Sequence, residues 1–264
     1  MNPFEEAQYH LLRFACRPHG QGICHNGPRK PIQLSSEFLS ETWLENADRA
    51  LRELIGAKWA DYVRGKSVVD FGCGDGRESV QIALAGAERV IGIDIEPVGI
   101  ATARRFAEEA SVADRCTFVT EIAPDVRTDV IISLNAFEHF ADPAAILASF
   151  RRILKPNGIV LVGFGPSWYH PYGSHVCPFP WAHLIMSEPA IMRWRSLYWA
   201  EDARTFREVG VHHLSISQFI RVVREGGFGF QRFETKPIRK MKWIHCKLTR
   251  EFTTTTVHAI LTAR

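Results

Sequence analysis

A glycine-rich turn is the part of this 264-residue sequence that points most directly to ligand chemistry. Gly72, Gly74 and Gly76 follow the apolar run SVVDF and precede a helical pattern. A turn without side chains lets a ligand approach the backbone, and the start of the following helix offers unpaired N–H donors. The turn therefore predicts a ligand site, although a tight strand-to-helix connection would also select glycine.

Two carboxylates indicate the kind of ligand. Asp94 ends the next apolar run, where a carboxylate can accept hydrogen bonds from both hydroxyls of a ribose. Dinucleotide sites read G-x-G-x-x-G and close over a pyrophosphate, whereas this turn reads G-x-G-x-G and directly follows an acidic strand residue, Asp70. Because an acid repels a pyrophosphate, the pattern favours a nucleoside that carries ammonium and sulfonium groups.

Histidines are the candidate general bases. His139 lies in FEHF after the fourth expected strand, and His170 and His175 follow the fifth. A histidine can take the proton that a hydroxyl or ammonium acceptor must lose as it reacts. A structural role stays open for each, such as a bond from His139 to Glu138 or to the backbone.

Metal binding is not predicted. The six cysteines are far apart without a CxxC pair, which indicates reduced thiols. Two groups of side chains are candidate ligand sets, and neither has the repeated short spacing of zinc sites: Cys16, His19, Cys24 and His25, and then His170, His175, Cys177 and His183. The first group fits better as a lid segment rich in glycine and proline.

The elements that position these residues alternate between strands and helices, which is typical of a parallel sheet. Strands are expected at 67–71, 89–93, 116–119, 129–134 and 159–164, and helices at 77–85, 98–110 and 143–154. A long amphipathic helix over 36–62, with a break near Gly56, precedes them. Residues 165–214 are aperiodic and aromatic. A helix from Ser215 to Gly226 and two strands, 228–235 and 253–263, end the pattern.

These motifs, in this order, resemble the class I S-adenosylmethionine-dependent methyltransferases. The shared pattern covers about 67–164: Asp70, the three glycines, Asp94, the Asp-led run DVIISLNAFEHF and the turn LKPNG. The resemblance implies an α/β fold with a doubly wound, mostly parallel, seven-stranded Rossmann-like sheet. It also implies an N-terminal helical segment (1–65) and a methyltransferase domain (66–264) with a substrate lid at 165–214.

The resemblance further implies roles for single residues toward S-adenosyl-L-methionine as cofactor. Asp70 would lie near the amino group of its methionine part, Asp94 would hold the ribose, and Ile95 would pack on the adenine. Asn135 would contact the methionine part or form the floor beneath the methyl group. The full set of implied cofactor-binding residues is Asp70, Gly72, Cys73, Gly74, Gly76, Asp94, Ile95, Glu121, Ile122 and Asn135.

One position departs from the pattern. Where these enzymes often carry an Asp after the third strand for the adenine amine, this chain has Glu121 followed by Ile122. His139, by contrast, resembles the Glu-His pair of quinone-type and other small-molecule methyltransferases. The expected function is therefore methyl transfer to an oxygen or nitrogen atom of a small-molecule acceptor. The alternatives are a catalytically silent cofactor-binding subunit and an NAD-dependent dehydrogenase.

Composition and charge limit the classes of binding partner that the chain can be expected to have. With 32 Lys and Arg against 29 acids, the net charge of +3 gives no strong field for a polyanion, so no nucleic-acid partner is expected. No membrane partner is expected either, because no apolar run approaches the roughly 20 residues of a membrane helix. The acidic N-terminus does not resemble a secretory signal, which favours the cytoplasm. The basic run 236–250 fits phosphate recognition or a solvated face, and the oligomeric state stays open.

Overall fold

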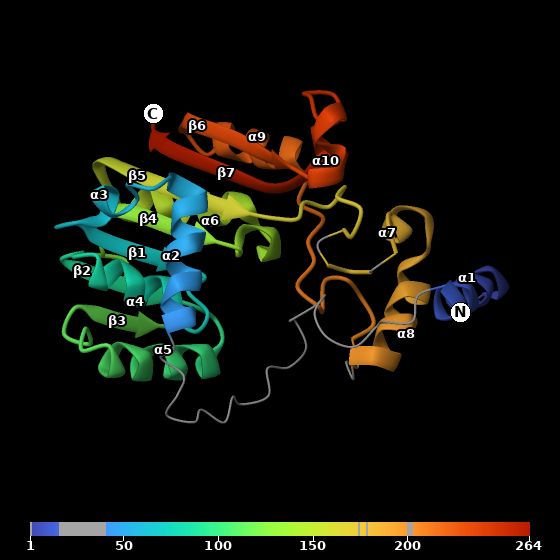
Figure 1. Ribbon diagram of the computed structural model, residues 1–264, viewed down its shortest axis with the longest axis horizontal. Helices are drawn as coiled ribbons and strands as arrows, with labels where there is room; N and C mark the ends of the chain where they lie inside the picture. The colour runs from blue at the N-terminus through green and yellow to red at the C-terminus, as the bar shows by residue number, and fades with distance from the viewer. Residues whose placement is uncertain (1, 16–40, 174, 178, 200–202) are drawn as a thin grey trace.

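A seven-stranded sheet organises the chain in the computed structural model, which describes residues 2–15, 41–173, 175–177, 179–199 and 203–264 (Figure 1). Its strands are β1 (Ser67–Phe71), β2 (Arg89–Ile93), β3 (Cys116–Val119), β4 (Thr128–Leu134), β5 (Leu154–Phe164), β6 (Phe228–Pro237) and β7 (Thr254–Ala263). They lie in the order β3-β2-β1-β4-β5-β7-β6. All neighbours pair in parallel except β7, which runs antiparallel to both β5 and β6. The predicted fold class is confirmed.

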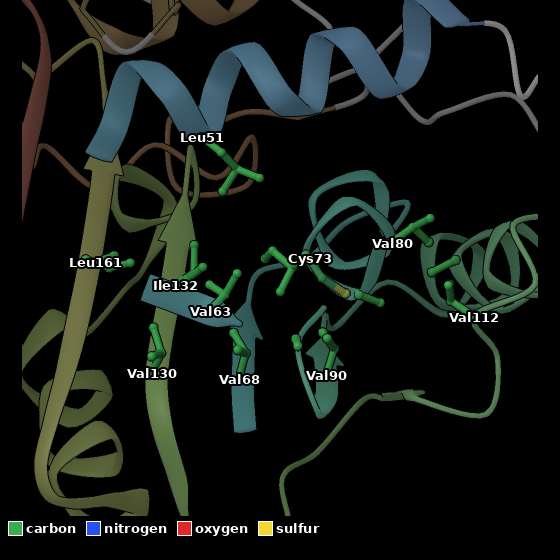
Figure 2. Packing of buried hydrophobic residues seen from close by; sticks show 14 of the residues in the cluster. Leu51, Val63, Val68, Cys73, Val80, Val90, Val112, Val130, Ile132 and Leu161 are labelled. Carbon is green, nitrogen blue, oxygen red and sulfur yellow. The ribbon is translucent and has the colours of Figure 1, made fainter. Parts of the chain in front are cut away.

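Helices cover both faces of the sheet because successive strand residues point to opposite sides. Val68 joins the hydrophobic cluster beneath one set of helices (Figure 2). Its neighbour Val69 joins the cluster beneath the other set. The first set is α2 (Glu41–Ile55), α3 (Ala60–Val63), α4 (Arg77–Leu84) and α5 (Pro97–Glu109). The second set is α6 (Pro143–Ile153) and α9 (Ile216–Glu225). Both faces of the sheet are therefore buried.

Local sequence signals set most helix ends. Asp142 caps α6, since its Oδ1 accepts hydrogen bonds from the N–H groups of Ala144 at 3.1 Å and Ala145 at 3.0 Å. Ser215 and Gln218 form a capping box at the start of α9. The expected helix over 36–62 is interrupted at Gly56, whose φ is 110°, and its first residues, 36–40, lie outside the described residues.

The LKPNG turn differs from expectation. Leu154 pairs with Thr128 and begins β5, and the register then shifts before Ile159 pairs with Val130. The strand is therefore longer at its beginning than predicted.

A third hydrophobic cluster belongs to helices that lie away from the sheet (Figure 1). The insertion between β5 and α9 contains the helices α7 (Ala182–Ile185) and α8 (Glu188–Trp199), and α1 (Pro3–Ala15) packs against α8. Tyr9 and Leu12 of α1 are buried with the fully buried Trp194 of α8. The N-terminal helix thus packs with the insertion rather than with the sheet.

Candidate cofactor and active site

The glycine turn is held against the end of β2. The N–H groups of Gly72 and Cys73 both donate to the carbonyl oxygen of Ile93, at 2.8 and 2.9 Å. Gly76 has φ +80°, and a Cβ there would lie 2.4 Å from the Cβ of Ala103 in α5. A side chain at Gly76 would therefore force α5 away from the turn, so this glycine is required by packing as well as by backbone conformation.

Asp94 fixes the tip of the same turn. Its Oδ2 accepts the Gly74 N–H at 2.7 Å, and its Oδ1 accepts the Glu96 N–H at 3.0 Å. Each carboxylate oxygen has a further lone pair, so these bonds leave acceptor capacity for a ligand. Ile95, next in sequence, is 84% exposed. The turn thus carries a fixed carboxylate beside an uncovered apolar side chain.

Acidic side chains surround the base of the turn. Asp70 is buried, and its Oδ2 accepts the Ser79 hydroxyl at 2.6 Å. Burial raises the pKa of Asp70 to about 6, the charges of Asp94 and Asp75 add to this, and the hydrogen bond from Ser79 opposes it. Burial also raises the pKa of Glu78 in the first turn of α4 to about 8. Such a group of carboxyls favours a cationic ligand and disfavours a pyrophosphate.

The other implied cofactor residues lie in mixed surroundings. The Cys73 thiol points into the core between the sheet and α4, so only its backbone faces the turn (Figure 2). Glu121 is exposed beyond β3, whereas Ile122 is half-buried against the cluster around α6. Asn135 follows β4 with φ +49°, and its N–H donates to the Gly163 carbonyl at 2.7 Å. The exposed Asn135 side chain is thus fixed at the carboxyl edge of β4.

His139 lies on the 3-10 helix η1 (Phe137–His139), directly after β4. Its Nδ1 lies 2.8 Å from the carbonyl oxygen of Gly210. Since a carbonyl only accepts, Nδ1 carries the proton in the neutral ring, and Nε2 is the nitrogen with the free lone pair. The half-buried ring therefore has the tautomer that a general base at Nε2 needs.

The two candidate bases in the insertion, His170 and His175, lie in different surroundings. His170 is buried, and its Nδ1 accepts the Tyr172 N–H at 3.2 Å, which places the ring proton on Nε2. Burial lowers the pKa of His170 to about 4, and the charges of His175 and His183 lower it further. Burial also lowers the pKa of His175, and the nearby charges of His139 and Arg195 contribute. His175 is thus close enough to interact electrostatically with His139 and with His170, but the Nε2 of His170 is a donor.

Two buried charged side chains, Glu138 and Arg195, lie near these histidines. Glu138 is buried, its Oε1 accepts the Gly165 N–H at 3.2 Å, and its Oε2 has no partner within the described part of the chain. Arg195 of α8 is buried and donates to the carbonyl oxygens of His175 and Val176, each at 3.2 Å. The sequence already offers Glu138 as a partner of His139, whereas Arg195 has no local signal and was not predicted.

The geometry does not support a metal site at His170, His175, Cys177 and His183. Among the residues that the structure describes, no group of three or more His, Cys, Asp and Glu side chains is arranged to hold a metal ion. His183, one member of this group, instead places Nε2 at 2.7 Å from the Trp168 carbonyl. The group that includes Cys16 and His25 lies outside the described residues.

Comparison with known proteins gives a family for the central part of the chain. Residues 69–162 match the family model of the methyltransferase domain. A ubiquinone biosynthesis O-methyltransferase of Rhodopseudomonas palustris is 36% identical over 108 residues, which cover 40% of this chain and 42% of that protein. The one from Neisseria meningitidis is 38% identical over 147 residues, covering 52% and 62%. The chain therefore spans less than two thirds of the length of these relatives.

A solved structure shows the same fold over most of the chain. The crystal structure of an S-adenosylmethionine-dependent methyltransferase from Mesorhizobium loti superposes with a TM-score of 0.55 at 20% identity, over 84% of this chain and 100% of that one. The resemblance seen in the motifs is thereby confirmed at the level of the domain and its fold.

Proposed function

We propose that this chain, whose residues 69–162 match the methyltransferase domain, transfers the methyl group of S-adenosylmethionine to an oxygen or nitrogen atom of a small molecule. A hydroxyl oxygen is favoured, since the matched relatives from Rhodopseudomonas palustris and Neisseria meningitidis are O-methyltransferases. The observation that carries the proposal is the glycine turn, pinned to Asp94 and surrounded by acids.

The residues at the turn fit this cofactor. The sulfonium and ammonium charges suit the carboxylates of Asp70 and Asp94, and a bound cation would lower the raised pKa of the neighbouring Glu78. Asp94 would hold the ribose hydroxyls through its remaining lone pairs, and the exposed Ile95 would cover one face of the adenine. A pyrophosphate-bearing dinucleotide fits poorly, because the nearby cation Arg77 is already paired with Asp75, at 2.5 Å.

Bound S-adenosylmethionine would supply a methyl group on a good leaving group, so the protein's main task is to align the acceptor and to remove its proton. His139 would do the second, taking the hydroxyl proton at Nε2 while its Nδ1–H stays on the Gly210 carbonyl. The insertion would supply the binding surface for the acceptor. Of its aromatic rings, Trp194 is core, whereas Tyr172 and Phe179 are partly exposed.

Calorimetric titration with S-adenosylhomocysteine and with NAD⁺ tests the cofactor assignment. We expect binding of the first and none of the second, and the reverse result would favour a dehydrogenase. Asp94→Ala should weaken binding. Asp125→Ala is the matched control, because Asp125 lies with the beginnings of β1 and β2 at the opposite edge of the sheet.

Turnover with labelled S-adenosylmethionine and a panel of phenols, carboxylates and amines tests the reaction itself. Methyl transfer to a phenol supports the favoured acceptor, and transfer only to an amine shifts the assignment to nitrogen. Tight cofactor binding without transfer to any acceptor would instead support the silent subunit.

A further inference from the structure

The segment that joins β6 to β7 is strongly basic. We call residues 236–250 the basic tip. It includes the 3-10 helix η2 (Arg239–Ile244) and leads into the short helix α10 (Arg250–Thr253). Six cations and no acid lie in it: Lys236, Arg239, Lys240, Lys242, Lys247 and Arg250. The tip therefore carries a concentrated positive charge on a chain whose net charge is only +3.

Among the described residues, four of these cations have neither an acidic nor an aromatic partner. Lys236 pairs with Glu234 at 2.8 Å, and the Arg250 guanidinium lies 5.7 Å from the centre of the Phe233 ring. The others, Arg239, Lys240, Lys242 and Lys247, are exposed, and none forms an ion pair with a carboxylate of the described residues. Their charge is available to an external anion.

Two large apolar side chains stand among these cations. Trp243 is 84% exposed and Leu248 is 91% exposed, so nothing in the described chain covers either. Exposed aromatic and aliphatic side chains within one short basic segment are uncommon on a surface that meets only water. A binding surface explains their presence better than folding does.

Hydrogen bonds to Thr235 and Thr253 fix the conformation of the basic tip. The His245 ring bridges Thr235, 2.9 Å from Nε2, and Thr253, 2.7 Å from Nδ1. The Ile238 N–H donates to the Thr253 carbonyl at 2.8 Å, which closes the base of the segment. The exposure of Trp243 and Leu248 is therefore imposed by an ordered segment.

We propose that the basic tip docks onto the surface of an anionic lipid bilayer. Lysines and arginines close to such a surface are attracted by its negative potential, and Trp is favoured at the boundary between head groups and acyl chains. Leu248 would enter the apolar layer below. A nucleic acid explains this surface less well. It has no apolar layer for Leu248 to enter, and the net charge of this chain is too small to create an extended positive field that would attract a polyanion.

Docking to a bilayer surface differs from the sequence-based expectation of no membrane partner. That expectation rested on apolar length, and no helix among the described residues is long and apolar enough to span a bilayer. Surface docking needs no spanning helix. It is also independent of the proposed function, since it can be measured without cofactor or acceptor.

Co-sedimentation of the full chain with vesicles tests the proposal. We expect binding to vesicles of phosphatidylcholine with 30–40% phosphatidylglycerol, a steep loss of binding with added salt, and weak binding to phosphatidylcholine alone. Changing Arg239, Lys240, Lys242 and Lys247 to Gln should reduce the partition coefficient about fivefold per charge, or by two to three orders of magnitude in total. Trp243→Ala should weaken binding several-fold at unchanged net charge.

A control variant separates the effect of the charges in the basic tip on vesicle binding from the effect of the net charge of the chain. Lys58, Arg64, Lys66 and Arg152 are exposed cations outside the tip, and their change to Gln alters the net charge equally. This control should bind vesicles almost as the unchanged chain does. Equal loss in the control, full binding by the tip variant, or binding only to a single-stranded oligonucleotide would each overturn the proposal. Circular dichroism of each variant establishes that it is folded.

Discussion

Replacing the buried acid Asp70 by Asn should make the protein more stable at neutral pH. Burial raises the pKa of this carboxyl from its ordinary 3.8 to about 6. Asn keeps the shape and can still accept the Ser79 hydroxyl, which donates to Oδ2 at 2.6 Å, but it cannot ionise. The substitution therefore removes a buried charge and little else.

The size and sign follow from proton linkage. Between about pH 4 and 6 the native state holds the Asp70 proton and the unfolded state does not, so the free energy of unfolding falls as the pH rises. At 1.36 kcal/mol per pH unit, the free energy of unfolding falls by about 3 kcal/mol in total, and this loss is complete above about pH 6. Asp70→Asn should recover about this amount at pH 7.5 and almost nothing at pH 4.

Urea unfolding of both proteins at several pH values measures the difference. Asp129→Asn serves as a control of opposite sign, because the hydrogen bonds from Ser67 and Lys155 hold the pKa of Asp129 at about 2. That variant should lose roughly 2 kcal/mol at pH 7.5. A difference between Asp70→Asn and the parent that does not vary between pH 4 and 6.5 would refute the reasoning. The same variant should bind S-adenosylhomocysteine more weakly, so stability and affinity should move in opposite directions.

Three further substitutions test the site. Asp94→Ala should weaken S-adenosylhomocysteine binding by about 1–3 kcal/mol in calorimetry, since charge-assisted hydrogen bonds are lost, and an unchanged affinity would contradict the ribose role. Gly76→Ala should destabilise by about 2–5 kcal/mol in urea unfolding, from the positive φ and the contact with Ala103, so a loss below about 1 kcal/mol would argue against the close packing. His139→Gln should lower turnover roughly 10²- to 10⁴-fold with little change in cofactor affinity, and a full rate would remove it as base.

The central strands were predictable because they are buried on both faces. Such strands are continuous apolar runs, and those from Ser67 and Arg89 begin and end as expected. The edge strand from Cys116 also has the expected ends, although only Phe118 in it is buried. The beginning of β5 was not predictable, because LKPNG has the composition of a turn, while the pairing of Leu154 with Thr128 depends on the neighbouring strand.

The cofactor side of the site follows from local sequence, and the acceptor side does not. Gly74 and Asp94 lie at the ends of neighbouring parallel strands, so topology alone brings them together. The Gly210 carbonyl that fixes the His139 ring is 71 residues away in sequence, within a stretch that has no periodicity. Likewise, no pattern separates the buried His170 from a solvent-facing histidine. Long-range packing decides both.

The pairing of α1 with α8 has a consequence for how this protein is made. Glu6 and Arg193, 2.8 Å apart, are separated by 187 residues, so α1 leaves the ribosome long before α8 has been made. Until then its apolar side, with Tyr9 and Leu12, has no partner from the helix that finally covers it. Contacts of such wide sequence separation form slowly. Shortened versions for expression should therefore keep both helices or remove both, because either one alone exposes half of a shared core.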